Sequence, residues 1–242
     1  MDEAAAFHGF TRETVSFFRK LKRNNHRVWF EKNRGTYEKH VLEPAKAFVA
    51  AMGPRLKGIS PNIVAAPKVN KSIFRLNRDT RFSTDKSPYK PNLGIYFWEG
   101  PLPRMESPGF YLHLEPPTFL LAAGYYVFPD WLIAPYRKAV VDPKHGKELT
   151  TILKKMADFT DFKIGGRHYK RIPPGYDASH PNAGLLLHNG LNAWWEAGIP
   201  EEFFSPGLVD YCVDKFRPLA PLHRWCAALL RRSSPPSPRI RF

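Results

Sequence analysis

The sequence predicts an α+β fold in one domain, with a mainly antiparallel sheet flanked by N-terminal and C-terminal helices. Two observations predict this fold. Apolar residues recur at helical spacing near both ends of the chain, whereas the stretch from Lys71 to Phe128 alternates with a period of two. No helical pattern interrupts that middle stretch, so successive strands are expected to pair in opposite directions.

The N-terminal part is expected to contain three helical segments. Thr11 is a typical N-cap residue for the first segment. The stretch "NNHRVWF" indicates a second start, with Asn24 or Asn25 as its cap. Pro44 is expected to open the third segment, because proline fits best in the first turn of a helix.

Three of the expected strands show clear alternation. In "KSIFRLN", Phe74 and Leu76 are expected to face the core, with Arg75 on the opposite side. The segments "LGIYFW" and "FYLHLE" alternate in the same way. A fourth segment, "TFLLAAGYYVF", is apolar on both faces and is therefore expected to be a central strand.

The rest of the chain is predicted to be mostly helical. Asp142 and Pro143 form an N-cap and N1 pair between two helices, and Ser205-Pro206 repeats that signal before a third. The stretch "GGRHYKRIPPGYDASHP" is expected to be a basic loop. A last helix is expected near residues 222–230. The domain is predicted to span residues 1–232, followed by a disordered Pro/Ser/Arg tail at 233–242.

Composition restricts the class of partner and the compartment. The net charge is +15 and the pI is near 9.9, so a polyanionic or phosphorylated partner is expected. The first residues lack a basic region typical of a secretory signal, and the longest apolar run is half the length that spans a bilayer. Cys212 and Cys226 have no metal-type spacing. A cytoplasmic protein with no membrane partner is therefore expected, while its oligomeric state stays open.

Four long stretches resemble a known family. They are "NNHRVWFEKNRGTYEKHVLEP", "KSIFRLNRDTRFSTDKSPYKPNLG", "GFYLHLEP" and "RIPPGYDASHP", and in this order they are similar to the domain-of-unknown-function family 2461. The resemblance runs from about Phe10 to about Phe216. It implies a shared fold but no reaction, because the family has no assigned activity. One departure is "AAGYYVFP", where the family has a more glycine-rich turn.

The stretch "KSIFRLNRDTRFSTDKSPYK" is the main candidate for a functional site. It carries six lysines and arginines against two aspartates. Guanidinium groups match phosphate geometry, which favours a basic pocket for a phosphate-bearing small molecule. In this hypothesis three arginines hold the anion, Asp79 orients them, and lysines and a tyrosine support it. The predicted ligand-binding residues are Arg75, Arg78, Asp79, Arg81, Lys86, Tyr89 and Lys90.

Two alternatives for this stretch stay open. Asp79 and Asp85 could neutralise several of the cations in an ion-pair network that fixes a loop to the sheet. The protein could also be a non-catalytic module that binds single-stranded nucleic acid, with Tyr96, Trp98 and Tyr111 as a stacking platform. No recognised nucleic-acid motif accompanies these aromatic residues.

The sequence does not decide whether the protein is an enzyme, and it leaves the cofactor open. If a reaction takes place, His113 or His180 is the expected proton carrier, since histidine titrates near neutral pH. Asp177 and His180 could equally shape a turn. His113 and Glu115 lie on one strand face, but no compact ligand motif accompanies them, so no metal site is predicted.

Overall fold

A computed structural model describes residues 6–158 and 161–233. These residues form a single α+β domain around one six-stranded sheet with the strand order β1-β2-β3-β4-β6-β5. Every neighbouring pair is antiparallel, which confirms the predicted fold class. The strands are β1 (Ile63–Val64), β2 (Leu93–Glu99), β3 (Gly109–Glu115), β4 (Thr118–Tyr125), β5 (Phe162–Arg167) and β6 (His188–Gly198).

The helices lie before and after the β2–β4 meander. The N-terminal ones are α1 (Arg12–Arg23), α2 (Arg27–Tyr37), the π-helical η1 (Glu38–Leu42) and α3 (Glu43–Lys57). The later ones are α4 (Asp130–Val141), α5 (Pro143–Ala157), α6 (Leu208–Phe216) and α7 (Ala220–Arg232). Three short 3-10 turns complete the described elements, namely η2 (Arg104–Glu106), η3 (Ala183–Leu187) and η4 (Glu201–Phe204).

Several helix boundaries follow from local capping. The backbone N–H of Thr11 donates to the Thr14 hydroxyl at 3.1 Å, and the Asp142 carboxylate accepts from the backbone of α5, as predicted. The predicted cap of α2 is wrong. His26 caps this helix by accepting from the backbone of Trp29, because Asn25 is engaged with a distant part of the chain.

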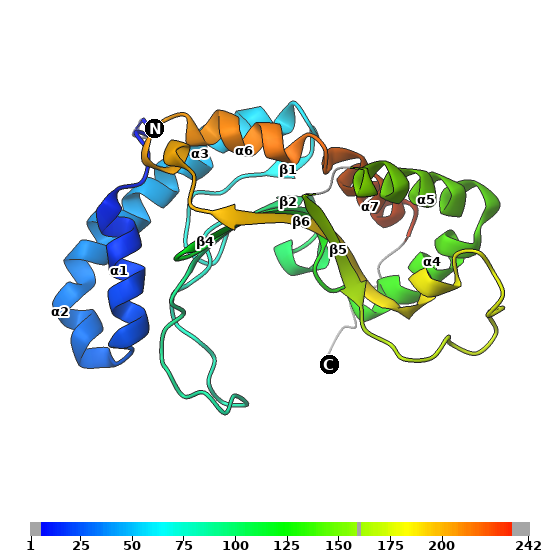
Figure 1. Cartoon of the computed structure of the whole chain (residues 1–242), viewed down its shortest axis with the longest axis horizontal. Coiled ribbons are helices and arrows are strands. Elements are labelled where there is room, and N and C mark those ends of the chain that lie inside the picture. The colour runs from blue at the N-terminus through cyan, green and yellow to red at the C-terminus, as the bar shows by residue number, and fades with distance from the viewer. Residues whose placement is uncertain (1–5, 159–160, 234–242) are drawn as a thin grey trace, which may run out of the picture.

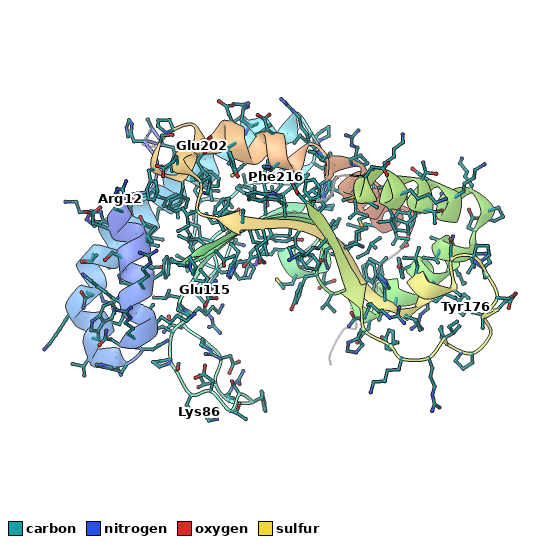
Figure 2. The ribbon with its side chains drawn as sticks, in the orientation of Figure 1. Arg12, Lys86, Glu115, Tyr176, Glu202 and Phe216 are labelled. Carbon is teal, nitrogen blue, oxygen red and sulfur yellow. The ribbon has the colours of Figure 1, made fainter. Side chains whose placement is uncertain are left out.

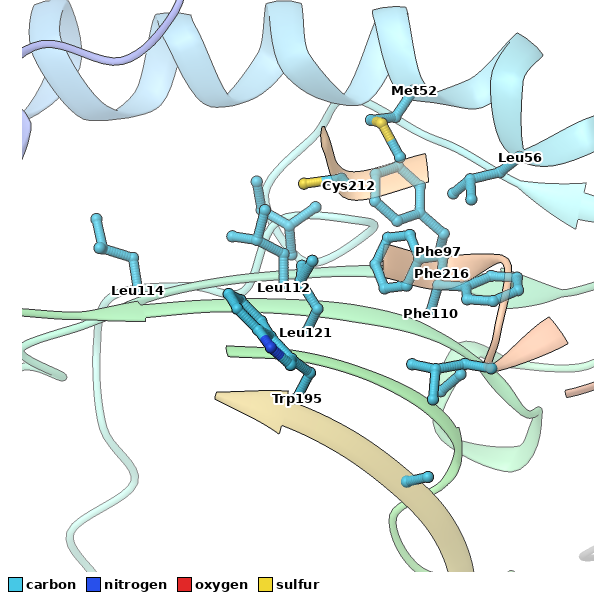
Figure 3. Packing of buried hydrophobic residues seen from close by; sticks show 14 of the residues in the cluster. Met52, Leu56, Phe97, Phe110, Leu112, Leu114, Leu121, Trp195, Cys212 and Phe216 are labelled. Carbon is cyan, nitrogen blue, oxygen red and sulfur yellow. The ribbon is translucent and has the colours of Figure 1, made fainter. Parts of the chain in front are cut away.

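One face of the sheet is covered by helices. Figure 1 shows α3, α6, α7 and α5 along that side. The core lies between these helices and the alternate residues of β2, β3 and β4, such as Phe97, Phe110 and Leu121, which are fully buried (Figure 3). Burying each such side chain contributes about 1.5–3 kcal/mol.

The opposite face is the open face of the sheet. In the described part of the chain, no α-helix lies across its centre (Figure 1). Because alternate strand residues point to opposite faces, the residues between the core positions line this side. The open face comprises Gly94, Tyr96 and Trp98 on β2, Tyr111, His113 and Glu115 on β3, Leu120 and Ala122 on β4, and Asn192, Trp194 and Glu196 on β6.

The stretch "KSIFRLN" is not a regular strand. It makes isolated bridges at Ile73 with Ile95 and at Asn77 with Tyr89. Ile73 takes the core position beside Ile95, so Phe74 turns toward the open face. The predicted orientation of Phe74 is therefore wrong. Likewise "GGR", predicted as loop, belongs to β5.

Ser233 follows α7 as its C-cap residue. The rest of the predicted disordered tail lies outside the described residues. Within residues 6–158 and 161–233, no helix is long and apolar enough to cross a membrane.

Candidate functional site

Two of the predicted arginines are already paired with acids. Arg81 donates to both carboxylate oxygens of Asp79, at 3.0 and 2.7 Å, and Arg78 forms an ion pair with Asp85. Hydrogen bonds from Arg81 lower the pKa of Asp79. Hydrogen bonds from Ser87, and then from Arg78, lower the pKa of Asp85 to about 2. These pairs form a local network of the kind that fixes a loop.

The paired residues lie on a loop that extends away from the sheet. Figure 2 shows this loop, with Lys86 near its end. The Lys86 ammonium donates to the Thr80 carbonyl within the same loop at 3.0 Å. Tyr89 anchors the loop base, since its side chain is 5% exposed and packs against Phe30. The backbone of Tyr89 also exchanges two hydrogen bonds with the Asn25 side chain.

Two other cations, Lys90 and Arg104, lie over the ring of Phe74, and together with Arg75 we call them the cation cluster. The Lys90 ammonium lies 5.6 Å from the Phe74 ring centroid, and the Arg104 guanidinium carbon lies 4.3 Å from it. Arg75 is an electrostatic neighbour of Lys90. In the described part of the chain, no carboxylate lies within 4.0 Å of a nitrogen of these three side chains.

The electrostatics of the cation cluster are unfavourable without an anion. Burial, and then the charges of Arg75, Arg104 and Arg78, lower the pKa of Lys90. Burial also lowers the pKa of Arg104. Arg104 donates to the Lys71 carbonyl, its one hydrogen bond to the described residues. A bound anion would therefore find unused donors and relieve the repulsion among the cations.

A line of three polar side chains runs along β3 beside this cluster. The Tyr111 hydroxyl lies 2.9 Å from His113 Nδ1, and His113 Nε2 lies 3.8 Å from Glu115 Oε2. The other oxygen of Glu115 accepts from Lys22 at 2.8 Å. Asn92 Nδ2 also lies 3.4 Å from His113 Nδ1. We call these three strand residues, Tyr111, His113 and Glu115, the β3 chain.

The protonation states along the β3 chain follow from burial. Burial raises the pKa of Tyr111 to about 12, so its hydroxyl keeps its proton and donates to His113. Burial lowers the pKa of His113, and the nearby charge of Glu115 opposes that shift without reversing it. His113 is therefore neutral at pH 7, with Nδ1 accepting and Nε2–H facing Glu115.

Gly94 allows the cluster and the β3 chain to meet. A Cβ at Gly94 would lie 2.9 Å from the Tyr111 hydroxyl and 3.2 Å from the Phe74 ring. Both groups therefore occupy the space above this glycine. The rings of Phe74 and Tyr111 pack edge to face, with centroids 6.0 Å apart. Phe74 thus contacts both Tyr111 and the two cations Lys90 and Arg104.

The second candidate proton carrier, His180, is engaged in a turn. Its Nδ1 accepts from the backbone of Asn182 at 3.0 Å. The Asp177 carboxylate accepts from the backbone and hydroxyl of Ser179. Both side chains therefore make the local bonds expected of turn-forming residues.

The described residues hold no group of three or more His, Cys, Asp or Glu side chains arranged to bind a metal. Cys212 and Cys226 are fully buried free thiols, and burial raises the pKa of both. The two thiols are therefore packing groups with little thiolate at neutral pH.

The aromatic residues of the open face are packed against protein. Trp98 is 8% exposed, and Tyr96 donates its hydroxyl to the Ser107 carbonyl at 2.7 Å. The rings of Tyr96 and Tyr111 meet edge to face at 6.5 Å. This arrangement leaves little ring surface for stacking bases.

The cation cluster is a surface site. Two hollows lined by described residues lie elsewhere, one of about 100 Å³ beside Trp29 and one of about 420 Å³ beside Trp195. Neither is lined by Arg75, Lys90 or Arg104.

Sequence patterns do not single out Arg104, although it completes the cluster. Arg104 stands in "PLPRMESP", whose prolines indicate a loop but not where that loop lies. The loop folds back because Tyr96 and Tyr125 donate to the carbonyls of Ser107 and Glu106. Asn92 and Lys22 reach the β3 chain through similar long-range packing, which local patterns do not reveal.

The fold and the site define an α+β protein with a helix-covered antiparallel sheet, whose open face carries, among the described residues, cations without an acid partner beside a half-buried histidine. The chain belongs to the family described as conserved hypothetical protein DUF2461, whose family model matches residues 13–225. This match confirms the resemblance found in the sequence. No curated protein matches the chain.

Proposed function

We propose that this protein binds a phosphate-bearing small molecule on the open face of its sheet, at the cation cluster. The observation that supports this most is Lys90, a partly buried ammonium with three arginines as neighbours and no acid paired with it among the described residues. A fold that holds such a group gives up stability, and a dianion would offset that loss.

The proposed ligand-binding residues differ from those expected from the sequence. Arg75 and Lys90 remain ligand-binding candidates, and Arg104 joins them. Arg78, Asp79, Arg81 and Lys86 instead bond within the loop. Guanidinium groups donate paired N–H bonds to phosphate oxygens, whereas Lys90 adds a point charge. His113 lies next to this site and is the candidate proton carrier.

Matched variants test the proposal. Titration calorimetry would measure binding of inorganic phosphate, nucleotides and sugar phosphates to the full chain, to Lys90→Ala and to Arg104→Ala. Lys86→Ala and Arg81→Ala serve as controls, because they remove equal charge from the protruding loop. Loss of binding in the first two variants alone supports the proposal, whereas equal losses in all four contradict it.

The same experiment separates a small molecule from nucleic acid. A short single-stranded oligonucleotide would be titrated in parallel at low and high salt. Binding of the oligonucleotide alone, weakening steeply with salt, would favour the nucleic-acid alternative. Binding of a sugar phosphate or nucleotide that depends on Arg104 would favour the small molecule.

A further inference from the structure

The β3 chain ends beside Phe74, whose ring lies under two cations of the cluster, and this position suggests more than binding. Tyr111 touches Phe74, the residue that carries Lys90 and Arg104 on its ring. The hydroxyl of the same tyrosine lies 2.9 Å from His113 Nδ1. An anion bound at the cluster would therefore be separated from Tyr111 only by Phe74, and Tyr111 is hydrogen-bonded to His113.

We propose that His113 is the proton-exchanging group of this site, taking up a proton when an anion binds at the cation cluster. The inference rests on the proposed function and deepens it, because it makes the site an acid–base centre for phosphate esters. Tyr111 contacts both Phe74 and His113, and Glu115 is placed to stabilise the imidazolium.

The physical reason is electrostatic. In its neutral form His113 accepts a hydrogen bond at Nδ1 from Tyr111. Protonation at Nδ1 removes this bond, so the bond favours the neutral ring. A nearby anion stabilises the imidazolium and shifts this balance. By linkage, protonation of His113 strengthens anion binding by the same factor.

The groups that face His113 influence its pKa before an anion binds. On β3 these are Tyr111 and Glu115, and from β6 the charge of Glu196 also acts on the ring. Lys22 of α1 reaches His113 only through Glu115, to which it is paired at 2.8 Å. Both acids favour the imidazolium, so the fold tolerates the charged form once the anion arrives.

The arrangement also provides a route for proton transfer. The imidazolium formed when the anion binds can return its Nδ1 proton to the Tyr111 oxygen as the phenolic proton moves to an oxygen of the bound ester. The His113 N–H bond breaks, the tyrosine O–H bond is re-formed, and one ester O–H bond forms, with no oxidant or second reactant. In this step His113 acts as the general acid through Tyr111.

Calorimetry with sulfate tests the coupling. Sulfate suits this purpose because, unlike phosphate, it stays a dianion between pH 5 and 8. Titrations of the full chain in two buffers of different ionisation enthalpy give the number of protons taken up per sulfate. If the pKa of His113 rises by one unit, we expect an uptake of about half a proton at the optimal pH.

The control is His113→Asn, which removes the titrating ring. We expect no pH-dependent uptake in this variant. Its sulfate affinity should match that of the wild type at pH 8, where His113 is neutral, and fall below it at pH 5.5. Imidazole ¹⁵N shifts of the wild type give a second readout, with Nδ1 becoming protonated as sulfate is added.

The outcomes distinguish the two proposals. If the wild type does not bind sulfate at millimolar concentrations, both fail. If sulfate binds and Arg104→Ala abolishes binding, but uptake is zero or persists in His113→Asn, only the role of His113 is overturned. Uptake confined to the chain with His113 supports it.

Discussion

The guanidinium carbon of Arg104 lies 4.3 Å from the centre of the Phe74 ring, and no acid within residues 6–158 and 161–233 pairs with it. Cation–π contacts of this kind contribute about 0.5–2 kcal/mol. That gain helps to hold Arg104 beside Lys90 in spite of their repulsion. The proposed binding of a phosphate group depends on this unbalanced charge.

Replacing Lys90 by methionine should separate stability from binding. The pKa of Lys90 is lowered in the folded protein, so the charged form costs stability at neutral pH, and this cost is relieved only as the pH rises toward 10.5. Because solvent screens part of this repulsion, Lys90→Met should stabilise the unliganded protein by no more than about 1 kcal/mol in urea unfolding. Phosphate affinity should fall at least tenfold. Lower stability together with unchanged affinity would argue against the site.

Adding a methyl group at Gly94 should disturb the junction of the cluster and the β3 chain. The new Cβ would lie 2.9 Å from the Tyr111 hydroxyl, so one of these groups has to move. We expect Gly94→Ala to cost about 1–3 kcal/mol in unfolding experiments. Gly198→Ala is the control, because nothing lies within 4 Å of its added Cβ. Similar losses in both variants would contradict this reading of Gly94.

The titration of His113 can be followed directly by NMR. Because burial lowers its pKa in the folded state, the unfolded chain binds more protons near pH 6. Wild-type stability should therefore fall, relative to that of His113→Gln, as the pH drops through 6.5. A midpoint for His113 above 6.5 in the free protein would be the opposite of this expectation.

A buried acid joins the C-terminal helix to the sheet. Glu99, 1% exposed, accepts from Ser60 at 2.7 Å and from His223 and Arg231 at 3.1 and 3.3 Å. Burial raises the pKa of Glu99, but hydrogen bonds from His223 and Ser60 outweigh it and the net pKa is lowered. The stability from Glu99 is therefore complete above pH 4.5 and is lost as the pH falls through its lowered value.

Removing this acid should be costly. Glu99→Ala leaves the surrounding donors unpaired, so we expect a loss of about 3–5 kcal/mol in urea unfolding at pH 7. Glu43→Ala, which breaks the exposed pair with Lys46, should cost about 0–1 kcal/mol. Comparable losses in the two variants would show that the buried network contributes little.

Much of the fold could be predicted because its signals are local. The alternation of "LGIYFW" and "FYLHLE" follows from burial on one face, and Asp142 caps α5 by a contact within one turn. The strand β6 also alternates, with Leu191 and Ala193 inward and Asn192 outward, although no strand is predicted there from the sequence. The short, glycine-containing strand β5 becomes recognisable only through its pairing with β6.

The candidate site could be predicted only in part. The charge of the basic stretch is visible in the sequence, but its division into paired and unpaired cations is not. Arg78 pairs with Asp85 across a loop, whereas Lys90 lies over the ring of Phe74 and pairs with neither described aspartate of the stretch. Arg104 arrives from a separate loop. Long-range packing decides each of these contacts, and spacing along the chain does not encode it.

A crystal structure of the full chain soaked in inorganic phosphate tests the central claim most directly. The account predicts phosphate density on the open face, within hydrogen-bond distance of Lys90 and Arg104 and absent from Arg104→Ala crystals. Phosphate bound to Arg78 and Arg81 in the protruding loop, or no phosphate on the open face, would contradict it.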